Sequence, residues 1–445
     1  MTVIPVGRVL AMPQRRQRGS GIGVAPSGPI YYCRTDGNDA NTGLTNSAGG
    51  AWQTARKAAR ALVPGDTLRF VHTGGASTEY VETAGPAIDW STAPAGGFGT
   101  SWAANQRIRI EANPGDEGKI VLKRDTAAGS AVADLRATSA ALNVQFVEFY
   151  NLIFDGLKNS NATNTYVPLY INASPRTDNT VHDIRFNGSE CKNSAQSSGF
   201  LQESTTTVGA GIPYNLLFTI DVATGRWGKL TNNGVNTQQH GCYMQGRNNE
   251  VSWTEISGNM GLGLQVHRDA SGADNCNDIY IHHVWSHGNG SSGFYYGRGA
   301  RGKIHNCLAH DNGTHGIRFD DGATDGQALN CTSVRNTTAN FTTAATAAVT
   351  GTIFTNCVAQ KLGVSASNWA DNGSTATITT CTNVALVDTD ATDPLFVNAA
   401  ADNFHLQSGS PCRDTGTDLS AQGITDDLDG TVRSGTYDQG AYEFV

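Results

Sequence analysis

The feature that most constrains this chain is a series of near-matching segments between about residue 240 and residue 385. Four of them align at a glycine, with steps of 22, 30 and 23 residues: QHGCYMQGRN at Gly241, GLGLQVHRDA at Gly263, SSGFYYGRGA at Gly293 and THGIRFDDGA at Gly316. A second series, out of phase with the first, has steps of 24, 26 and 24 residues: Cys307, Cys331, Cys357 and Cys381. Repeats of about 20–30 residues are typical of stacked units, each of which needs its neighbours to bury its apolar face.

Each repeat contains short runs in which apolar and polar residues alternate, as in Ile279, Ile281 and Val284. Turns rich in Asn and Gly separate these runs, and no helical period lies between them. The pattern therefore predicts an all-β solenoid, a parallel β-helix. The four aligned glycines are called the ladder glycines below. In this register, the first and third residues after each of them point inward, and all are apolar or aromatic: Cys242 and Met244, Leu264 and Val266, Phe294 and Tyr296, Ile317 and Phe319.

Composition agrees with a solenoid. The 445 residues include 52 Gly, and only 16% are charged. A solenoid grows by adding coils, so this length fits one long domain. The net charge of −8 argues against a nucleic-acid partner. No apolar run approaches the roughly 18 residues that a membrane span needs, so we expect no membrane insertion.

The nine cysteines allow two interpretations. They could form disulfides, but four of them fall at one coil position each, which favours an internal row of buried thiols. The CxxC spacing of zinc sites is missing, and we predict no zinc site.

The N-terminal residues 1–29 include Arg15, Arg16 and Arg18 and contain no apolar stretch typical of a signal peptide. This arm is either flexible or anchors the protein to a larger assembly. Residues 30–72 contain a short amphipathic helix with Trp52 and Ala55 on its apolar face, ended by Pro64-Gly65, and this helix is expected to cap the solenoid.

The remaining chain divides into coils and a closing segment. Residues 73–385 are predicted to form the coils, and residues 386–445 a C-terminal cap. Two stretches, 83–103 and 201–238, are too long for coil turns, so we expect them to leave the stack as loops or small hairpins.

Both ends resemble a known family. The opening, Tyr32 to Phe70 with GNDANTG and PGDT, and the terminal DPLF, SP and DQGAYE are similar to right-handed parallel β-helix proteins of the pectate-lyase-like class. This resemblance implies a glycan-handling protein: a polysaccharide lyase, a glycoside hydrolase or a phage tailspike. The TDGNDANTGLTNSAGGA run and the missing signal peptide look most like the phage group. The resemblance then implies a homotrimer on a virion that recognises bacterial surface polysaccharide, with a secreted bacterial enzyme as the alternative.

The register also predicts where a glycan site lies. Outward positions after the ladder glycines, together with the corner residues that follow, form one patch about 15 Å tall. It contains Tyr243, His267, Arg268, Asp269, Tyr295, Arg298, Arg318, Asp320 and Asp321, and we expect Trp227 from the 201–238 insertion at its rim. Tyr, His, Arg and Asp bind sugars and carboxylates. The alternative is a solvated face with chance ion pairs.

Three activities fit this patch. In β-elimination, His267 or Arg298 is the base, Tyr295 the acid, and Arg268 or Arg318 the clamp on a uronic carboxylate. In inverting hydrolysis, Asp269 acts with Asp320 or Asp321, two coils away and about 10 Å apart. In the third, the patch only binds a glycan.

Two smaller groups of polar residues also form patterns in the sequence. Asp36, Asn38, Asp39 and Asn41 resemble either a calcium loop or a plain turn, and no other cofactor is expected. Asn259, Asn289 and Asn312 each precede a ladder glycine by 4 residues. This spacing predicts a stacked row of asparagines bonded along the coil turns.

Overall fold

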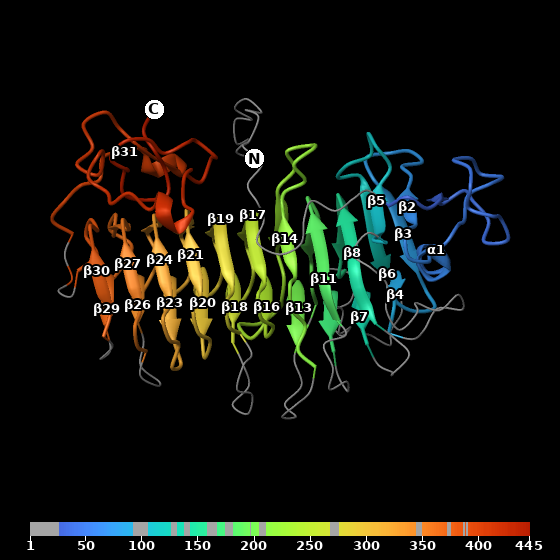
Figure 1. The fold of residues 1–445 in the computed structure, drawn as a ribbon, viewed down its shortest axis with the longest axis horizontal. Helices are drawn as coiled ribbons and strands as arrows, with labels where there is room; N and C mark the ends of the chain where they lie inside the picture. The colour runs from blue at the N-terminus through green and yellow to red at the C-terminus, as the bar shows by residue number, and fades with distance from the viewer. Residues whose placement is uncertain are drawn as a thin grey trace.

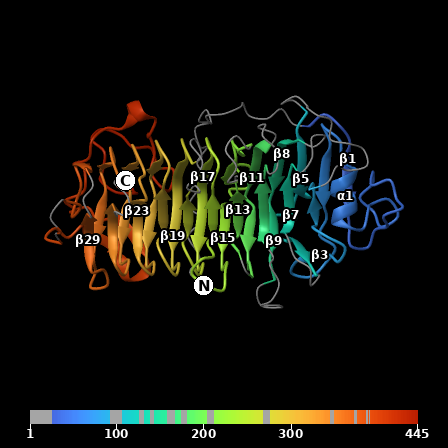
Figure 2. The ribbon, with the colours of Figure 1, turned by 90° about the horizontal axis from the view of Figure 1, so that it is seen from below.

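The computed structural model describes residues 26–91, 106–125, 131–137, 143–157, 167–173, 181–195, 197–203, 211–267, 276–343, 349–371, 375–385, 388 and 390–445. They form an elongated parallel β-helix whose coils stack along the long axis (Figure 1). Seen from below, the strands of successive coils lie side by side along the molecule (Figure 2). The predicted fold class is therefore confirmed. No helix in these ranges is long and apolar enough to cross a membrane.

Each coil contributes to three columns of parallel strands. The first column contains β1 (Ile30–Cys33), β2 (Thr67–Phe70), β5 (Ile108–Ala112), β8 (Val144–Tyr150), β11 (Val181–Asn187), β14 (Leu217–Thr219), β21 (Lys303–His305), β24 (Gln327–Leu329), β27 (Ile353–Thr355) and β30 (Thr377–Thr379). The second contains β3 (Thr78–Glu82), β6 (Ile120–Arg124), β9 (Leu152–Asp155), β12 (Glu190–Lys192), β15 (Gly228–Thr231), β22 (Leu308–His310), β25 (Thr332–Val334) and β28 (Val358–Gln360). The long strands β17 (Glu250–Ser257) and β19 (Tyr280–His287) run through both columns.

The third column is a separate ten-stranded sheet, called the third sheet below. Its strands are β4 (Ile88–Asp89), β7 (Ala131–Arg136), β10 (Val167–Asn172), β13 (Phe200–Glu203), β16 (Cys242–Met244), β18 (Leu264–Val266), β20 (Phe294–Gly297), β23 (His315–Asp320), β26 (Ala339–Thr343) and β29 (Ser367–Asp371). The ladder segments found in the sequence are β16, β18, β20 and β23. Because their register is continuous, equivalent residues of successive coils form straight rows.

Side chains in the core follow the predicted register. The inward residues Cys242, Leu264, Phe294 and Ile317 and their partners two positions on are all buried. A Cβ atom on Gly263 would lie 2.5 Å from the carbonyl oxygen of Gly293, so the coils approach too closely for any other residue. This contact explains the glycine ladder.

The cysteine row is also confirmed, with one difference. All nine cysteines are free, and Cys307, Cys331 and Cys357 are fully buried on adjacent coils. Cys381 is only partly buried, because it lies on the last coil of the row.

The turn between the second column and the third sheet holds the predicted asparagine row. The side-chain amide of Asn259 donates to Asn289 Oδ1 at 2.8 Å, and that of Asn289 donates to Asn312 Oδ1 at 2.9 Å. The row extends beyond the prediction, to Asn233 before Asn259 and Asn336 after Asn312. These bonds satisfy buried amides and fix the spacing of the coils.

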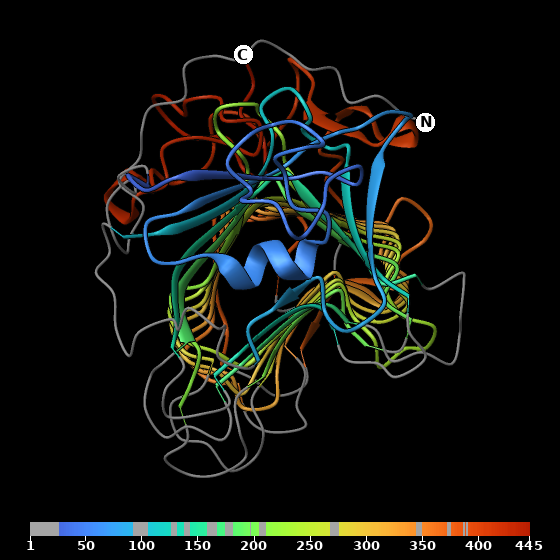
Figure 3. The ribbon, with the colours of Figure 1, turned by 90° about the vertical axis from the view of Figure 1, so that its right-hand side faces the viewer.

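The N-terminal end is capped as expected. Helix α1 (Ala55–Ala61) packs Ala55, Ala58 and Ala59 into the core, and Thr54 caps it by accepting a hydrogen bond from the Lys57 amide. Viewed along the stack, α1 lies across the end of the coils (Figure 3).

The C-terminal segment, by contrast, is not an end cap. With β31 (Phe396–Asn398), β32 (Asn403–Leu406) and two short 3-10 turns, η1 (Ala399–Ala401) and η2 (Ser420–Gln422), it folds back along the side of the last coils (Figure 1). It covers the outward apolar residues Leu308, Val334 and Val358 of the second column. The prediction for 386–445 is corrected accordingly.

The predicted insertions also need correction. Residues 201–238 contain β14 and β15, which pair with their neighbours in the stack, so this stretch is largely coil. Its short strands, of 3 and 4 residues, left too weak a sequence period to recognise. In the other stretch, β4 lies in the third sheet, and residues 92–103 fall outside the described residues.

Candidate functional site

Most of the predicted site residues converge on the outer face of the third sheet. Tyr295 lies in β20, Arg318 and Asp320 lie in β23, and His267 directly follows β18. The register pairs Tyr295 with Arg318, so these side chains lie one strand spacing apart, about 4.8 Å. Arg298 and Asp321 follow β20 and β23 at the corner, each in the left-handed region, with φ of 56° and 51°.

The carboxylate of Asp321 is the centre of this cluster. Its Oδ2 accepts a hydrogen bond from the Tyr295 hydroxyl at 3.0 Å and lies 3.2 Å from His267 Nε2. Arg298 Nε lies 3.6 Å from the same oxygen. One carboxylate oxygen, which follows β23, therefore positions an imidazole, a phenol and a guanidinium from the two preceding strands of the sheet, β18 and β20.

Arg318 and Asp320 form a second part of the cluster. The guanidinium of Arg318 is paired with Asp320, and its Cζ lies 5.3 Å from the centre of the Tyr295 ring. Asp320 is only 1% exposed, and its Oδ1 also accepts the backbone N–H of Asp321 at 2.7 Å. Asp320 therefore holds Arg318 and the corner in place. The sequence predicted an outward position for this residue, but its side chain is not exposed to solvent.

The protonation states around the cluster are set by burial. Burial, with the charges of Asp320 and Asp321, raises the pKa of the Tyr295 hydroxyl, so this group keeps its proton at neutral pH and can donate it. Burial lowers the pKa of His240 and of His315 to about 4, with further contributions from His267 and Arg318, respectively. Both of these flanking imidazoles are therefore neutral at pH 7.

Four predicted residues are not part of the cluster as described. Tyr243, in β16, belongs to the same outer row but lies two strands from Tyr295, and its hydroxyl accepts a hydrogen bond from Gln245 at 2.7 Å. Arg268 and Asp269 lie outside the described residues. The prediction for Trp227 is wrong: it precedes β15 in the second column and packs edge-on against Trp253, 5.7 Å away. The misassigned insertion caused this error.

Sequence reasoning also missed polar residues on the same face, farther toward the N-terminus. Tyr170 and Asn172 of β10 meet Glu203 of β13 and Arg136 of β7, all on the outer side of the third sheet. The signal was present as strand alternation in VPLYIN and FLQE, but these segments lack the ladder glycine that revealed the later coils.

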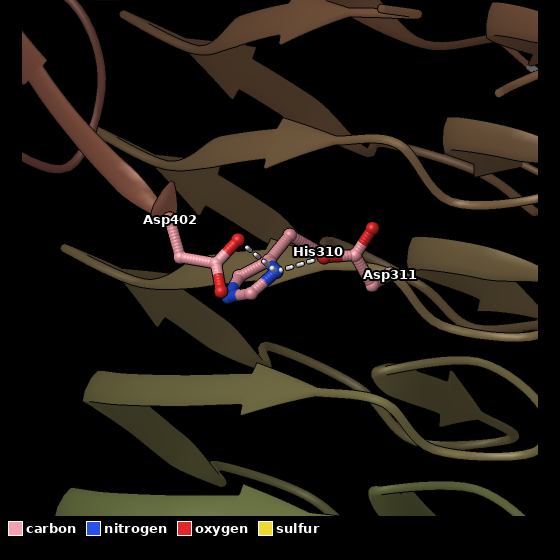
Figure 4. Close-up of side chains that lie close together, drawn as sticks. All are labelled: His310, Asp311 and Asp402. Atoms are coloured by element: carbon pink, nitrogen blue, oxygen red, sulfur yellow. Dashed lines mark hydrogen bonds and ion pairs between the residues drawn. The ribbon is translucent and has the colours of Figure 1, made fainter. Parts of the chain in front are cut away.

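Within the described residues, one group of three metal-type ligands lies close together: His310, Asp311 and Asp402 (Figure 4). His310 Nδ1 lies 2.6 Å from Asp311 Oδ2, and its Nε2 accepts a hydrogen bond from Trp285 Nε1 at 2.6 Å. The guanidinium of Arg335 is paired with both carboxylates. Because Arg335 already neutralises them, this group is an ion-pair network that ties the C-terminal segment to the coils.

The residues considered for calcium form an ordinary turn. Asp39 Oδ1 accepts the backbone N–H groups of Gln53 and Thr54 at 2.8 and 2.9 Å, and Asp36 pairs with Arg34. The side chain of Asn38 accepts the Ala40 N–H. These oxygens serve the turn before α1, and we derive no metal site from them.

The comparisons with known proteins concern the fold. Residues 219–383 match the family described as right handed beta helix region. No curated protein sequence matches the chain. Among solved structures, pectate lyase Pel9A is similar over 94% of this chain and 97% of its own, with 15% identity and a TM-score of 0.54.

Two further structures are less similar. The A-module of the Azotobacter vinelandii mannuronan C-5 epimerase AlgE6 matches over 72% of this chain and 86% of its own, at 14% identity and a TM-score of 0.43. ORF18 of Geobacillus virus E2 matches over 71% and 53%, at 11% identity and a TM-score of 0.41. With its three columns of parallel strands and its similarity to the solved structure of pectate lyase Pel9A, the chain has the right-handed parallel β-helix fold.

Proposed function

We propose that the outer face of the third sheet binds an acidic polysaccharide and cleaves it by β-elimination. The observation that carries this proposal is the convergence of His267, Tyr295 and Arg298 on one oxygen of Asp321. β-Elimination needs a base, an acid and a cation for the uronic carboxylate, and these three groups supply one of each.

The roles follow from the hydrogen bonds. Because Asp321 holds Nε2 of His267, that nitrogen carries the proton and Nδ1 keeps its lone pair, which makes the imidazole the base. The base removes the proton from the carbon next to the carboxylate, the bond to the leaving oxygen breaks, and Tyr295 gives that oxygen a proton. Arg298 and Arg318 neutralise the uronic carboxylate.

Hydrolysis is less well supported. It needs two carboxylates with a water or sugar between them, about 5–10 Å apart. Asp320 is buried and paired with Arg318, and Asp269 lies outside the described residues. Elimination uses groups that the described cluster already positions.

The test is to incubate the protein with a panel of uronic-acid polysaccharides and to analyse the products by ultraviolet absorbance and mass spectrometry. We expect unsaturated ends from the wild-type protein and none from Tyr295→Phe, which keeps the ring but loses the proton donor. The matched control is Tyr31→Phe, in β1 of the first column and away from the third sheet, which should remain active. Saturated ends, or intact polymer that stays bound, would contradict elimination.

We further propose that this glycan-acting β-helix serves as a homotrimeric phage spike. The basic arm of residues 1–29, ahead of a capped solenoid, and the resemblance of its first segments to phage proteins support this setting. A secreted bacterial enzyme is the alternative. Deletion of residues 1–29 should leave a folded β-helix that no longer incorporates into phage particles, and normal incorporation would contradict the proposal.

A further inference from the structure

The outer face of the third sheet carries a regular pattern beyond the cluster already described. One register row runs along six successive strands, in the order Tyr170, Leu201, Tyr243, Gln265, Tyr295 and Arg318. A tyrosine therefore occurs on every second strand. Consecutive tyrosines are two strand spacings apart, about 9.6 Å.

Ionisable side chains occupy the strands between the tyrosines. Arg136 and Glu203 lie on β7 and β13, on either side of Tyr170, and the register places them in one row with Asn172. His267 follows β18, and Arg318 lies on β23, on either side of Tyr295. Tyrosines and ionisable groups thus alternate strand by strand from β7 to β23.

These side chains, from Arg136 on β7 to Arg318 on β23, are called the strip below. The two ends of the strip are built alike. At the C-terminal end, Arg318 pairs with Asp320 and lies over the ring of Tyr295. The hydroxyl of Tyr295 donates a hydrogen bond to the carboxylate of Asp321. At the N-terminal end, Arg136 Nη2 pairs with Asp134 at 2.5 Å, and its Cζ lies 5.2 Å from the ring of Tyr170. The hydroxyl of Tyr170 donates to Glu203 at 2.6 Å. The same three interactions occur in both places.

The N-terminal end is also suited to bind a carboxylate. The carboxylate of Asp134 accepts hydrogen bonds from Nε and Nη2 of Arg136. The Nη1 group of the guanidinium therefore remains for a ligand. The Arg136 side chain is 32% exposed, whereas Asp134 beneath it is 1% exposed. The buried acid therefore holds the guanidinium in an accessible position, as Asp320 does for Arg318.

We propose that an extended acidic polysaccharide lies along this strip from Arg136 to Arg318, with every second sugar at the level of a tyrosine. A sugar in an extended 1,4-linked chain advances by about one strand spacing, so a chain parallel to the stack stays in register with the coils. In an extended chain whose successive sugars are rotated by half a turn, every second sugar presents the same ring face to the protein. The spacing of Tyr170, Tyr243 and Tyr295 matches that repeat. The inference rests on the proposed function and adds the path of the polysaccharide and a second carboxylate site.

The test is to measure the affinity of oligomannuronates of two, four, six and eight sugars by calorimetry, using inactive Tyr295→Phe protein so that the ligands stay intact. The two end arginines lie six strand spacings apart, about 29 Å, so only the longer oligomers reach both. In this background, Tyr170→Ala should weaken binding of the eight-sugar ligand severalfold. The double variant Asp134→Asn with Arg136→Gln removes the second carboxylate site without leaving a buried unpaired charge, and should weaken it about tenfold. Neither change should affect the two-sugar ligand.

Arg69→Ala is the matched control, because Arg69 is an ion-paired arginine on the first column, away from the strip, and its loss should change no affinity. Circular dichroism confirms the fold of each variant, and Tyr170→Phe, which keeps the ring, should retain most of the affinity. If the N-terminal variants bind every length like the parent while Arg318→Ala loses affinity, the extended strip is wrong and the proposed function stands. If Arg318→Ala also binds normally, both are wrong.

Discussion

The second column and the third sheet use the same coils and strand spacing, but in the last coils the side chains that they point outward differ in chemistry. In the last coils, the second column points Leu308, Val334 and Val358 outward, and the C-terminal segment buries all three. The third sheet points Tyr243, Gln265 and Arg318 outward, and each stays partly exposed. The apolar residues that point outward from the last coils are thus covered by the chain itself. A row of tyrosines and ionisable groups is the one left for a ligand.

The C-terminal segment that covers the second column contains a buried ion pair. Arg433 is fully buried, and its Nη1 lies 3.0 Å from Glu443 Oε2. The same guanidinium donates to the carbonyl oxygens of Asp426 and Gly440 at 3.0 and 2.9 Å. Because these bonds join Asp426, Gly440 and Glu443 around one guanidinium, Arg433 fixes the shape of the C-terminal segment.

The largest expected effect comes from breaking this pair. Arg433→Ala leaves Glu443 buried without its partner, which should cost about 3–5 kcal/mol in the free energy of unfolding. The segment should then separate from Leu308, Val334 and Val358 and expose them. Urea denaturation and dye binding measure both effects. The control, Arg301→Ala, removes a surface pair with a side chain 55% exposed and should cost less than about 1 kcal/mol. Equal losses for the two variants would show that the segment is not held in this way.

This contrast also explains what the sequence could and could not predict. Inward residues and the asparagine row repeat along the later coils, so their spacing predicted the register, the thiol row and the cluster around Tyr295. The C-terminal segment has no repeat. Its position over Leu308 depends on contacts between residues far apart in the sequence, and periodicity carries no information about those. Trp227 was misplaced for a related reason, since β14 and β15 are too short to show a period.

The third sheet should make the protein sensitive to acid. His240 and His315 flank its outer cluster, and their pKa values are lowered from 6.5 to about 4. The folded state therefore favours the neutral imidazoles, and their contribution is complete above pH 6.5 and lost as the pH falls toward 4. In the fold, the Leu262 amide donates to Nδ1 of His240 at 2.9 Å, a bond that protonation of that nitrogen would break.

Each histidine should lower the free energy of unfolding by about 2–3 kcal/mol between pH 7 and pH 4. Urea denaturation across this range measures the loss. His240→Asn keeps a polar acceptor without the titration, so its stability should depend less on pH than that of the wild type. An unchanged pH profile in this variant would mean that other groups cause the acid sensitivity.

The smallest effect on stability should come from the exposed edge of the third sheet. The Arg298 side chain is 34% exposed and its Nε lies 3.6 Å from Asp321 Oδ2, so Arg298→Ala should cost less than about 1 kcal/mol. If the outward row is kept for a ligand, the same change should weaken binding of an acidic oligosaccharide by about 1.5–3 kcal/mol, the value of a hydrogen bond to a charged group. Calorimetry at low and high salt separates this loss from screening. A variant that loses neither stability nor affinity would place the carboxylate away from this corner, on Arg318 alone. A large loss of stability would show that Arg298 stabilises the fold, as Arg433 does on the covered face. The two faces would then differ only in whether the chain covers them, and not in their chemistry.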